Sequence, residues 1–396
     1  MLLYLASARM DLRFEIPLPA AGLPDLTAAP DAPGVVLLEP DGGRAYLART
    51  QNIRKRLVRL LHADVGRGRI FGDSVRRVEY QPAASPFETN WLLYRAARSV
   101  WPSDYRARLR LRAPACIKLH LSNPYPRTSV TTQIATGDAL YFGPFRGRAQ
   151  AEAFEDRLLD FFGVRRCVEN LDPAPNHPGC IYGEMGKCLR PCQQAIDEAH
   201  YREEAAKLEE AFVTRGRSLA VTLEAERDEA SDALEFEEAQ RLHAKLEALK
   251  ETLRLAEEPA RALDQLHGAI VQRSTTPDAV SIWRLHAGFL QPSFDFALES
   301  DAERPQSLDR RVREAMENFE PQTGSPKERE DHLALLRRWL YSSWRKGELV
   351  AFDDLERLPY RKLVNAIART ATGAGEKREL TAAMRAQEKE RKEAQG

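Results

Sequence analysis

Four of the five cysteines, Cys167, Cys180, Cys188 and Cys192, lie within 26 residues of one another. Twelve, seven and three residues separate them in turn. Because thiolates are soft ligands, four cysteines that converge can hold a zinc ion or an iron–sulfur cluster. Zinc ribbons normally show two close Cys-x-x-Cys pairs, which this segment lacks, but spacing alone does not choose between the metals. Two disulfides are the alternative, and a reducing cytosol disfavours them.

The residues around the cysteines suit a tight loop around an ion or cluster. Gly179, Gly183 and Gly186 let the backbone turn sharply. His177 is a spare ligand candidate, although a histidine in a proline-rich loop is more often simply exposed, and Cys116 is expected to be a small buried side chain. The basic residues that would offset the thiolate charge are Arg165, Arg166, Lys187 and Arg190.

Charge is unevenly distributed along the 396 residues, although 59 Lys and Arg balance 59 Asp and Glu. From Arg44 to Arg112 there are 16 Lys and Arg against five Asp and Glu, whereas residues 198–258 are acidic. Zero net charge taken alone argues against a nucleic-acid binder, but segregated charge indicates two different partners. Two ordinary solvated faces of opposite sign are the alternative.

Length and hydropathy predict a multidomain protein of the cytoplasm. A chain of this length corresponds to two to four domains. No apolar run approaches 18 residues, and the first residues make a poor signal peptide because charge follows so early. We therefore expect a cytoplasmic protein without a membrane partner.

Turn signals and hydrophobic period predict an α+β architecture. Asp41-Gly42-Gly43 lies between two apolar runs and indicates a β-hairpin. Asn52 can cap a helix that ends near His62, and Ser85 with Glu88 forms a capping box for a helix that ends near Val100. Strand patterns follow at 115–145 and 263–299, and further helices are expected near 147–162, 305–318, 326–345 and 353–370.

These elements divide the chain into six segments. The expected order is an N-terminal strand and loop at 1–32, a small mixed α/β domain at 33–112, a cysteine-rich region at 113–196, a helical hairpin at 197–257, an α+β C-terminal region at 258–372 and a charged tail at 373–396.

The acidic segment 197–257 is expected to form two long helices that pack along an apolar stripe. That stripe, which includes Leu234, is usually the seam between two antiparallel helices. Phe236, beside Glu237 and Glu238, would be an exposed aromatic ring within an acidic rim. An exposed aromatic side chain in such a rim is typical of a protein-binding surface.

Several motifs now fall in one order, and the chain resembles the N-terminal half of UvrC, the family of excinucleases that act in bacterial nucleotide excision repair. The resemblance covers about residues 33–252. The matching segments are Pro33–Leu38, Ala45–Ala48 and Asn52–Leu57 for a GIY-YIG nuclease core, Ser85–Leu93 for its glutamate helix, Pro124–Arg127 and Tyr141–Phe145 for the lead into the cysteine region, and Leu234–Ala239 for the UVR motif.

The resemblance implies a 4Fe-4S cluster at the four cysteines, with zinc less favoured. It also implies DNA as a partner and a UvrB-like protein bound through the UVR-like hairpin. The partner-binding residues would be Leu234, Phe236, Glu237 and Glu238.

The catalytic set carried over from the GIY-YIG family is incomplete. Glu88 takes the position of the metal-holding glutamate for Mg or Mn, Arg56 that of the phosphate-binding arginine, and Tyr46 that of the second signature tyrosine. Val36, Ala48 and Arg106 replace the first signature tyrosine, the signature glycine and an asparagine. Losing a general base typically costs about 10²–10⁴-fold in rate. Either a residual nuclease makes a single incision, or the domain is catalytically silent and contacts DNA, which is the interpretation we favour.

Each of these residues also has a plain structural explanation. Glu88 could be a helix-capping glutamate, Tyr46 a core residue and Arg56 part of a solvated basic face. A run of basic residues on one short helix and beyond it nevertheless suits a phosphate backbone. The expected DNA-binding residues are Arg54, Lys55, Arg59, Arg67 and Arg69.

The C-terminal region resembles only the opening strands of the second, RNase H-like nuclease of UvrC. Asp295 alone does not make a two-metal site. The later helices carry aromatic and basic residues that are either core with a solvated edge or a DNA-facing surface, namely Arg337, Arg338, Trp339, Tyr341, Trp344 and Arg345. We therefore expect a protein resembling a truncated UvrC, and the third alternative is a non-DNA scaffold with a redox-sensing cluster.

Overall fold

The structure is a computed structural model that describes residues 12–20, 23–62, 75–299, 306–317, 319–354 and 357–373. The N-terminal sheet has the antiparallel order β1-β4-β2-β3. Its strands are β1 (Phe14–Glu15), β2 (Gly34–Pro40), β3 (Tyr46–Thr50) and β4 (Val75–Pro82). Gly42 and Gly43 have φ angles of 94° and 91°, which glycine adopts without strain, and they form the predicted turn between β2 and β3.

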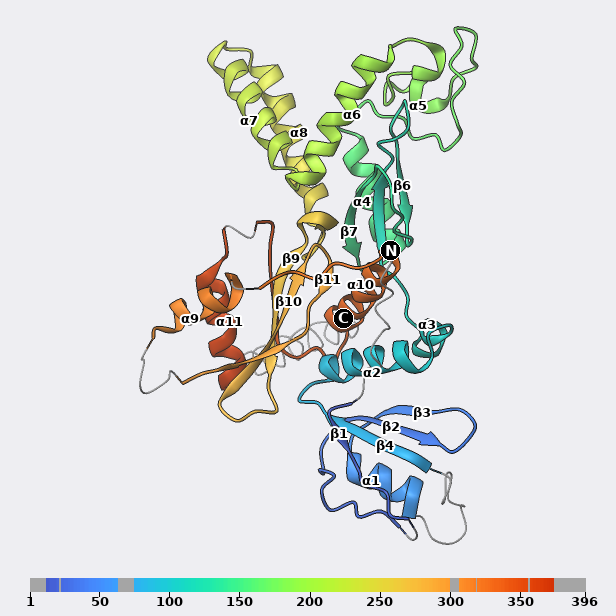
Figure 1. The fold of residues 1–396 in the computed structure, drawn as a ribbon. Helices are drawn as coiled ribbons and strands as arrows, with labels where there is room; N and C mark the ends of the chain where they lie inside the picture. The colour runs from blue at the N-terminus through green and yellow to red at the C-terminus, as the bar shows by residue number, and fades with distance from the viewer. Residues whose placement is uncertain are drawn as a thin grey trace, which may run out of the picture.

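Two capped helices cover opposite faces of this sheet (Figure 1). The Asn52 side chain accepts a hydrogen bond from the Lys55 amide and begins α1 (Ile53–Leu57), which continues as a π-helical turn η1 (Val58–His62). The Ser85 side chain caps α2 (Pro86–Val100). Both helix starts were predicted from capping residues, and both are confirmed.

The middle sheet is also antiparallel, with the order β6-β5-β7-β8. Its strands are β5 (Ala115–Leu119), β6 (Thr128–Thr131), β7 (Leu140–Phe145) and β8 (Arg261–Ala262). The helices of this part are α3 (Tyr105–Leu109), which precedes the sheet, α4 (Arg148–Leu159), α5 (Ile181–Glu184), the 3-10 turn η3 (Pro191–Gln193) and α6 (Glu198–Val213). Phe142 lies 5.4 Å from Phe154 and 5.1 Å from Phe212 between ring centroids, so α4 and α6 share one core with this sheet.

The prediction of two long helices across 197–257 is wrong, because three helices occupy this stretch. They are α6, α7 (Arg217–Asp232) and α8 (Phe236–Arg254). Gly216 has a φ of 77° between α6 and α7, and a Cβ there would lie 2.6 Å from a Leu253 methyl carbon. The chain therefore turns at Gly216, α6 stays with the middle sheet, and α7 and α8 form a hairpin that projects from the rest of the protein (Figure 1).

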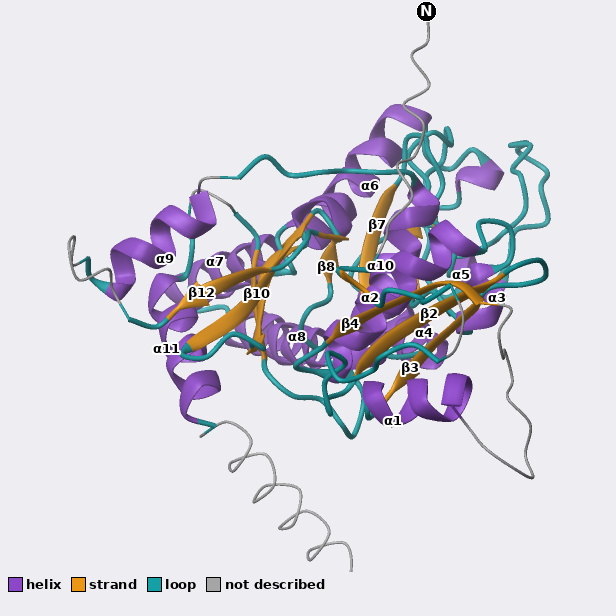
Figure 2. Ribbon diagram, turned by 60° about the horizontal axis from the view of Figure 1, so that its bottom comes forward, coloured by secondary structure: helices purple, strands orange, loops and turns teal. Residues whose placement is uncertain are grey.

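The C-terminal sheet is antiparallel as well, with the order β11-β10-β9-β13 and β12 beside β10. Its strands are β9 (His267–Arg273), β10 (Ala279–His286), β11 (Phe289–Leu290), β12 (Phe294–Ala297) and β13 (Glu348–Phe352). The 3-10 turn η4 (Leu263–Gln265) leads into it, and the later helices are α9 (Leu308–Glu317), α10 (Pro326–Leu340) and α11 (Tyr360–Thr372). Helices α9 and α11 pack together on one side of this sheet (Figure 2).

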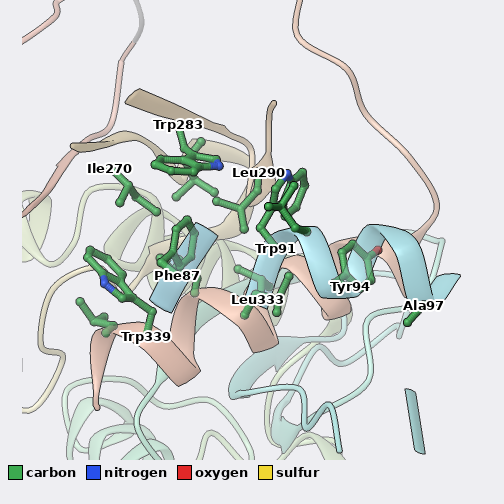
Figure 3. Packing of buried hydrophobic residues seen from close by; sticks show 14 of the residues in the cluster. Phe87, Trp91, Tyr94, Ala97, Ile270, Trp283, Leu290, Leu333 and Trp339 are labelled. Atoms are coloured by element: carbon green, nitrogen blue, oxygen red, sulfur yellow. The ribbon is translucent and has the colours of Figure 1, made fainter. Parts of the chain in front are cut away.

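Helix α2 joins the N-terminal and C-terminal parts into one hydrophobic core. The Phe87 ring lies 5.3 Å from the rings of both Trp283 on β10 and Trp339 on α10 (Figure 3). The same core includes Val35 and Leu37 of the N-terminal sheet. The described residues thus form a mixed α/β structure with three antiparallel sheets, and none of their helices is both long and apolar enough to cross a membrane.

Candidate functional site

Tyr46 and Arg56 form a contact on the face of the N-terminal sheet that α1 covers. Arg56 Nη2 donates a short hydrogen bond to the Tyr46 hydroxyl, and the guanidinium carbon lies 5.6 Å from the ring centroid. Val36 points to the same face and is fully buried in its core. The tyrosine hydroxyl is therefore engaged, and valine offers no proton acceptor beside it.

Glu88 lies on the other face of the sheet, at the start of α2. Its Oε2 accepts a hydrogen bond of 2.7 Å from the Ala84 amide, and its own amide donates to Ser85 Oγ at 3.0 Å. Burial raises the pKa of the Glu88 carboxyl, the Ala84 amide opposes that rise, and the Asp295 carboxylate adds to it. Glu88 is a capping-box glutamate, and the sheet separates it from the Tyr46–Arg56 pair.

The expected DNA-binding residues differ in what they contact. The Arg54 guanidinium makes contacts within the N-terminal domain, because it donates hydrogen bonds to the Ala29 and Thr27 carbonyls and pairs with Asp31 at 3.1 Å. Lys55 and Arg59 are exposed. The remaining two, Arg67 and Arg69, lie outside the described residues.

The four clustered cysteines lie near one another as free thiols. Cys188 and Cys192 are buried, and Cys167 and Cys180 are half-buried. Burial is the main reason that the pKa of the Cys188 thiol is raised to about 11; the charges of the other three thiols add to this rise, and the Arg190 amide opposes it. In the described part of the chain, however, no three His, Cys, Asp or Glu side chains converge tightly enough to hold a metal ion as they stand.

Basic and amide groups surround these sulfurs. Arg165 Nη1 lies 3.4 Å from Cys167 Sγ, and the Arg190 amide lies 3.4 Å from Cys188 Sγ. Arg165 is 1% exposed, and its Nη2 atom is buried without a hydrogen-bond partner. Gly179 has a φ of 76°, and a Cβ there would lie 2.9 Å from the Gln193 side chain. The segment thus supplies four soft donors, N–H groups aimed at sulfur and one buried guanidinium nitrogen, Arg165 Nη2, without a hydrogen-bond partner.

The turn of the α7–α8 hairpin exposes two apolar side chains. Leu234 is 70% exposed and Phe236 is 66% exposed, so the predicted exposed aromatic ring is confirmed. The hairpin seam consists of Leu223, Leu242, Leu246 and Leu249, which are buried. The assignment of Leu234 to that seam is wrong, because its φ of 62° turns the chain there. Glu237 and Glu238 begin α8 beside this tip, and Glu238 accepts a hydrogen bond of 2.8 Å from Arg241.

Arg106, at the position of the family's asparagine, belongs to an ionic cluster between α3 and α10. It pairs with Glu330 at 2.8 Å and with Asp331 at 2.7 Å, and the Tyr105 hydroxyl donates to Asp331 at 2.6 Å. Arg98 on α2 pairs with Glu328 in the same region. These contacts join residues more than 220 positions apart, which no local sequence pattern indicates.

The aromatic and basic residues of α10 and its end are mostly structural. Trp339 is buried, which confirms the core alternative for that side chain. Arg337 donates to the Arg146 carbonyl at 2.9 Å, and Arg338 donates to the Leu109 and Arg110 carbonyls. Tyr341 and Trp344 are partly buried against the same core, and the Arg345 guanidinium lies 5.1 Å from the Trp339 ring.

Asp295 on β12 is tied to the nearby loop. Its two carboxylate oxygens accept hydrogen bonds from the Ser274 hydroxyl at 2.7 Å and the Thr276 hydroxyl at 2.6 Å. Asp295 therefore has a local structural role in this sheet.

A cleft of about 610 Å³ lies between α2, β11 and the start of α10, and the sequence did not predict it. Arg95, Lys327 and His332 line it. The one local signal was Arg95, which follows the aromatic residues Trp91 and Tyr94 on α2. That signal does not identify the residues of β11 and α10 that complete the cleft.

Two family descriptions match adjacent parts of the chain. Residues 115–211 match "UvrC/Cho excinuclease, middle domain", and residues 217–252 match "UvrB/uvrC motif". The first region contains β5 to β7, the cysteine segment and most of α6, and the second contains α7 and most of α8. The helical turn at Gly216 therefore lies between the two matches.

Similar curated proteins carry the name UvrABC system protein C. The protein from Methanothermobacter thermautotrophicus is 27% identical over 71% of this chain and 48% of its own length. The protein from Desulfatibacillum aliphaticivorans is 23% identical over 80% of this chain and 53% of its own length. That from Saccharopolyspora erythraea is 28% identical over 57% of this chain and 32% of its own length.

This chain thus spans about half the length, or less, of these curated relatives. No solved structure matches it. The middle-domain match, the adjoining UVR match and the relatives all point to the same proteins, and the chain is similar to UvrC proteins, most specifically over residues 115–252.

Proposed function

We propose that this protein acts in nucleotide excision repair by binding DNA and a UvrB-like protein, and that its own GIY-YIG-type nuclease site is impaired. The observation that carries the proposal is the exposed Leu234–Phe236 tip of the UVR hairpin. Apolar side chains left uncovered together at the end of a projecting hairpin favour a protein partner.

The partner surface has a definable chemistry. Leu234 and Phe236 supply the apolar contact, and Glu237 and Glu238 supply an acidic rim. Fully burying a phenylalanine side chain contributes about 1.5–3 kcal/mol. A complementary partner therefore offers an apolar recess edged by basic residues.

The test is a pull-down of purified UvrB with the full chain and with Phe236→Ala. We expect the substitution to weaken binding by about tenfold or more, since that is the factor for each 1.4 kcal/mol. Val221→Ala is the matched control, because Val221 is 65% exposed on the same hairpin but lies near the start of α7. Unchanged UvrB binding by Phe236→Ala would contradict the partner surface.

Three features support an impaired nuclease. Val36 is buried where the family has a tyrosine, Arg56 engages the Tyr46 hydroxyl, and Glu88 caps α2 on the opposite face of the sheet. A metal-dependent phosphodiester cleavage needs these groups to converge on one phosphate. The domain instead contributes exposed cations, Lys55 and Arg59, for phosphate contact.

The incision assay decides between this interpretation and an active single-cut endonuclease. Purified protein with Mg²⁺ or Mn²⁺ is incubated with nicked, damaged and plain duplex DNA. We expect salt-dependent binding without incision. Incision that Glu88→Ala abolishes would overturn the silent-domain interpretation and favour the nuclease with a metal ion at Glu88. Absence of any salt-dependent DNA affinity would favour a non-DNA scaffold with a redox-sensing cluster.

For the four cysteines we propose a 4Fe-4S cluster held by Cys167, Cys180, Cys188 and Cys192. The support is the donor set itself together with the N–H groups of Arg165 and Arg190 directed at sulfur. N–H groups near cysteine sulfur tune the reduction potential of such clusters. The Arg165 Nη2 atom, buried without a hydrogen-bond partner, also suits an anionic group beside these cysteines.

Anaerobic purification tests the cluster. We expect a coloured protein with four irons per chain, and Cys188→Ser should lower the iron content. Cys116→Ser is the matched control, because Cys116 is buried in β5, in the sheet instead of the cysteine segment. A colourless protein that binds one zinc per chain would overturn the iron–sulfur assignment.

A further inference from the structure

The cleft between α2, β11 and α10 has an aromatic wall. Trp91 and Tyr94 come from α2, and Phe289 comes from β11. Trp91 points from α2 toward Leu290 of β11 (Figure 3), and the rings of Trp91 and Tyr94 lie 5.2 and 5.6 Å from the His332 ring of α10 between centroids. These rings are largely buried, with Trp91 6% and Phe289 7% exposed, so the parts of them that reach the cleft offer a planar ring an aromatic contact. Base–aromatic contacts of this kind tolerate any nucleobase.

His332 on α10 is a buried side chain that lines this cleft, and no hydrogen bond to its Nε2 is found within the described residues. It is 5% exposed, and its Nδ1 lies 3.1 Å from the Leu290 amide. Because a backbone N–H can only donate, Nδ1 is the acceptor and the neutral ring carries its proton on Nε2. The Glu328 carboxylate lies 3.9 Å from Nε2, which is beyond hydrogen-bonding distance. A ligand in the cleft can therefore accept a hydrogen bond from His332.

Two cations from different helices line the same cleft. Arg95 extends from α2 and Lys327 from the first turn of α10, and neither makes an ion pair within the part of the chain that the structure describes. Arg98 and Glu328 also line the cleft but neutralise each other, with Nη2 and Oε2 3.1 Å apart. The free charge in the cleft is therefore positive and suits an anion.

Cations, a histidine donor and an aromatic wall in one cleft match a phosphate joined to a planar ring. We propose that this cleft binds one nucleotide of a single DNA strand, with its phosphate between Arg95 and Lys327 and its base against Trp91 and Phe289. The His332 Nε2–H then donates to an acceptor on the base. The choice of a DNA strand as the source of the nucleotide rests on the proposed repair function, whereas the nucleotide chemistry rests on the cleft.

The test uses fluorescence anisotropy of a labelled oligothymidylate with the full chain. Arg95→Gln combined with Lys327→Gln keeps the fold, because both side chains are exposed, and should weaken binding by about tenfold or more. Arg361→Gln, an exposed arginine on α11 outside the cleft, should leave the affinity unchanged. Unchanged affinity in the double variant would overturn the proposal.

Two competitors define the ligand. Thymidine monophosphate should displace the oligonucleotide at lower concentration than inorganic phosphate, because the base adds contacts to Trp91 and His332. Equal competition by phosphate would overturn the nucleotide assignment. His332→Gln, checked by thermal melting for intact fold, should weaken the monophosphate more than phosphate.

The same proteins distinguish this site from the proposed function. A double variant that loses the oligonucleotide but keeps duplex DNA and UvrB supports a separate nucleotide cleft. If the unaltered chain binds no DNA at all, the repair function fails, and direct titration with thymidine monophosphate still tests the cleft. No quenching of tryptophan fluorescence in that titration would overturn it.

Discussion

Two helices of this protein begin with a phenylalanine, Phe87 at the start of α2 and Phe236 at the start of α8, yet the two side chains lie in opposite environments. We call the contact of α2 with the C-terminal part the α2 junction. Phe87 on α2 is covered by Trp283 and Trp339, which lie about 200 and 250 positions further along the chain. Phe236 at the start of α8 stays 66% exposed. An apolar side chain on a helix therefore indicates a binding surface only where no distant segment of the folded chain covers it.

The largest expected effect comes from removing the centre of the junction. Phe87→Ala should lower the free energy of unfolding by about 3–5 kcal/mol, because it leaves a cavity between two tryptophan rings. Chemical denaturation measures the loss. A loss below about 1 kcal/mol would show that the two sheets do not share a core through α2.

A second substitution tests the polar part of the same junction. Asp331→Asn keeps the size of a fully buried side chain but removes the charge that pairs with Arg106. Hydrogen bonds to charged groups contribute about 1.5–3 kcal/mol, so we expect a destabilisation in that range. Asp309→Asn on α9 serves as an exposed control and should leave the unfolding curve unchanged.

The junction should also respond to pH through His332. Burial lowers the pKa of His332 to about 4, from an ordinary value of 6.5 in the unfolded chain. Between these values the unfolded state binds more protons, so stability is complete above about pH 6.5 and falls as the pH drops toward 4. His332→Gln should reduce the slope of melting temperature against pH in this window. An unchanged slope would assign the acid sensitivity to His120 or His267, whose pKa values are also lowered to about 4.

The smallest expected effect on stability is at the tip. Phe236→Ala should change the free energy of unfolding by less than about 0.5 kcal/mol, because the side chain is mostly exposed in the folded chain. Differential scanning calorimetry of the variant measures this. Destabilisation comparable to that of Phe87→Ala would mean that Phe236 packs within the protein, and the contrast between the two regions would fail.

Part of the fold followed from local patterns. Asn52 and Ser85 capped the helices predicted from them, and the Asp41-Gly42-Gly43 turn joined two strands as expected. Capping and turn formation depend on neighbouring residues, which is why the sequence reveals them. The break at Gly216 escaped prediction, because the contact with Leu253 that fills its surroundings comes from a different helix.

The candidate sites divide in the same way. The cysteine spacing and the exposed Phe236 could be identified from short segments, although the sequence did not show how Arg165 and Arg190 approach the sulfurs. The catalytic assignment carried over by resemblance placed Tyr46, Arg56 and Glu88 together. The strand register instead puts even-numbered side chains of β2 toward α1 and odd-numbered ones toward α2, so Glu88 lies across the sheet from the other two.

The sequence by itself determined the two helix caps, the Asp41-Gly42-Gly43 turn and the exposed Phe236, because each depends on residue type and short spacing. Only the tertiary structure decided which apolar faces are covered, which charges are paired and which cleft remains open. The physical reason is that Arg106 pairs with Asp331, and Arg95 lines one cleft with His332, across more than 220 residues of sequence. Burial is a property of all the segments that surround a side chain.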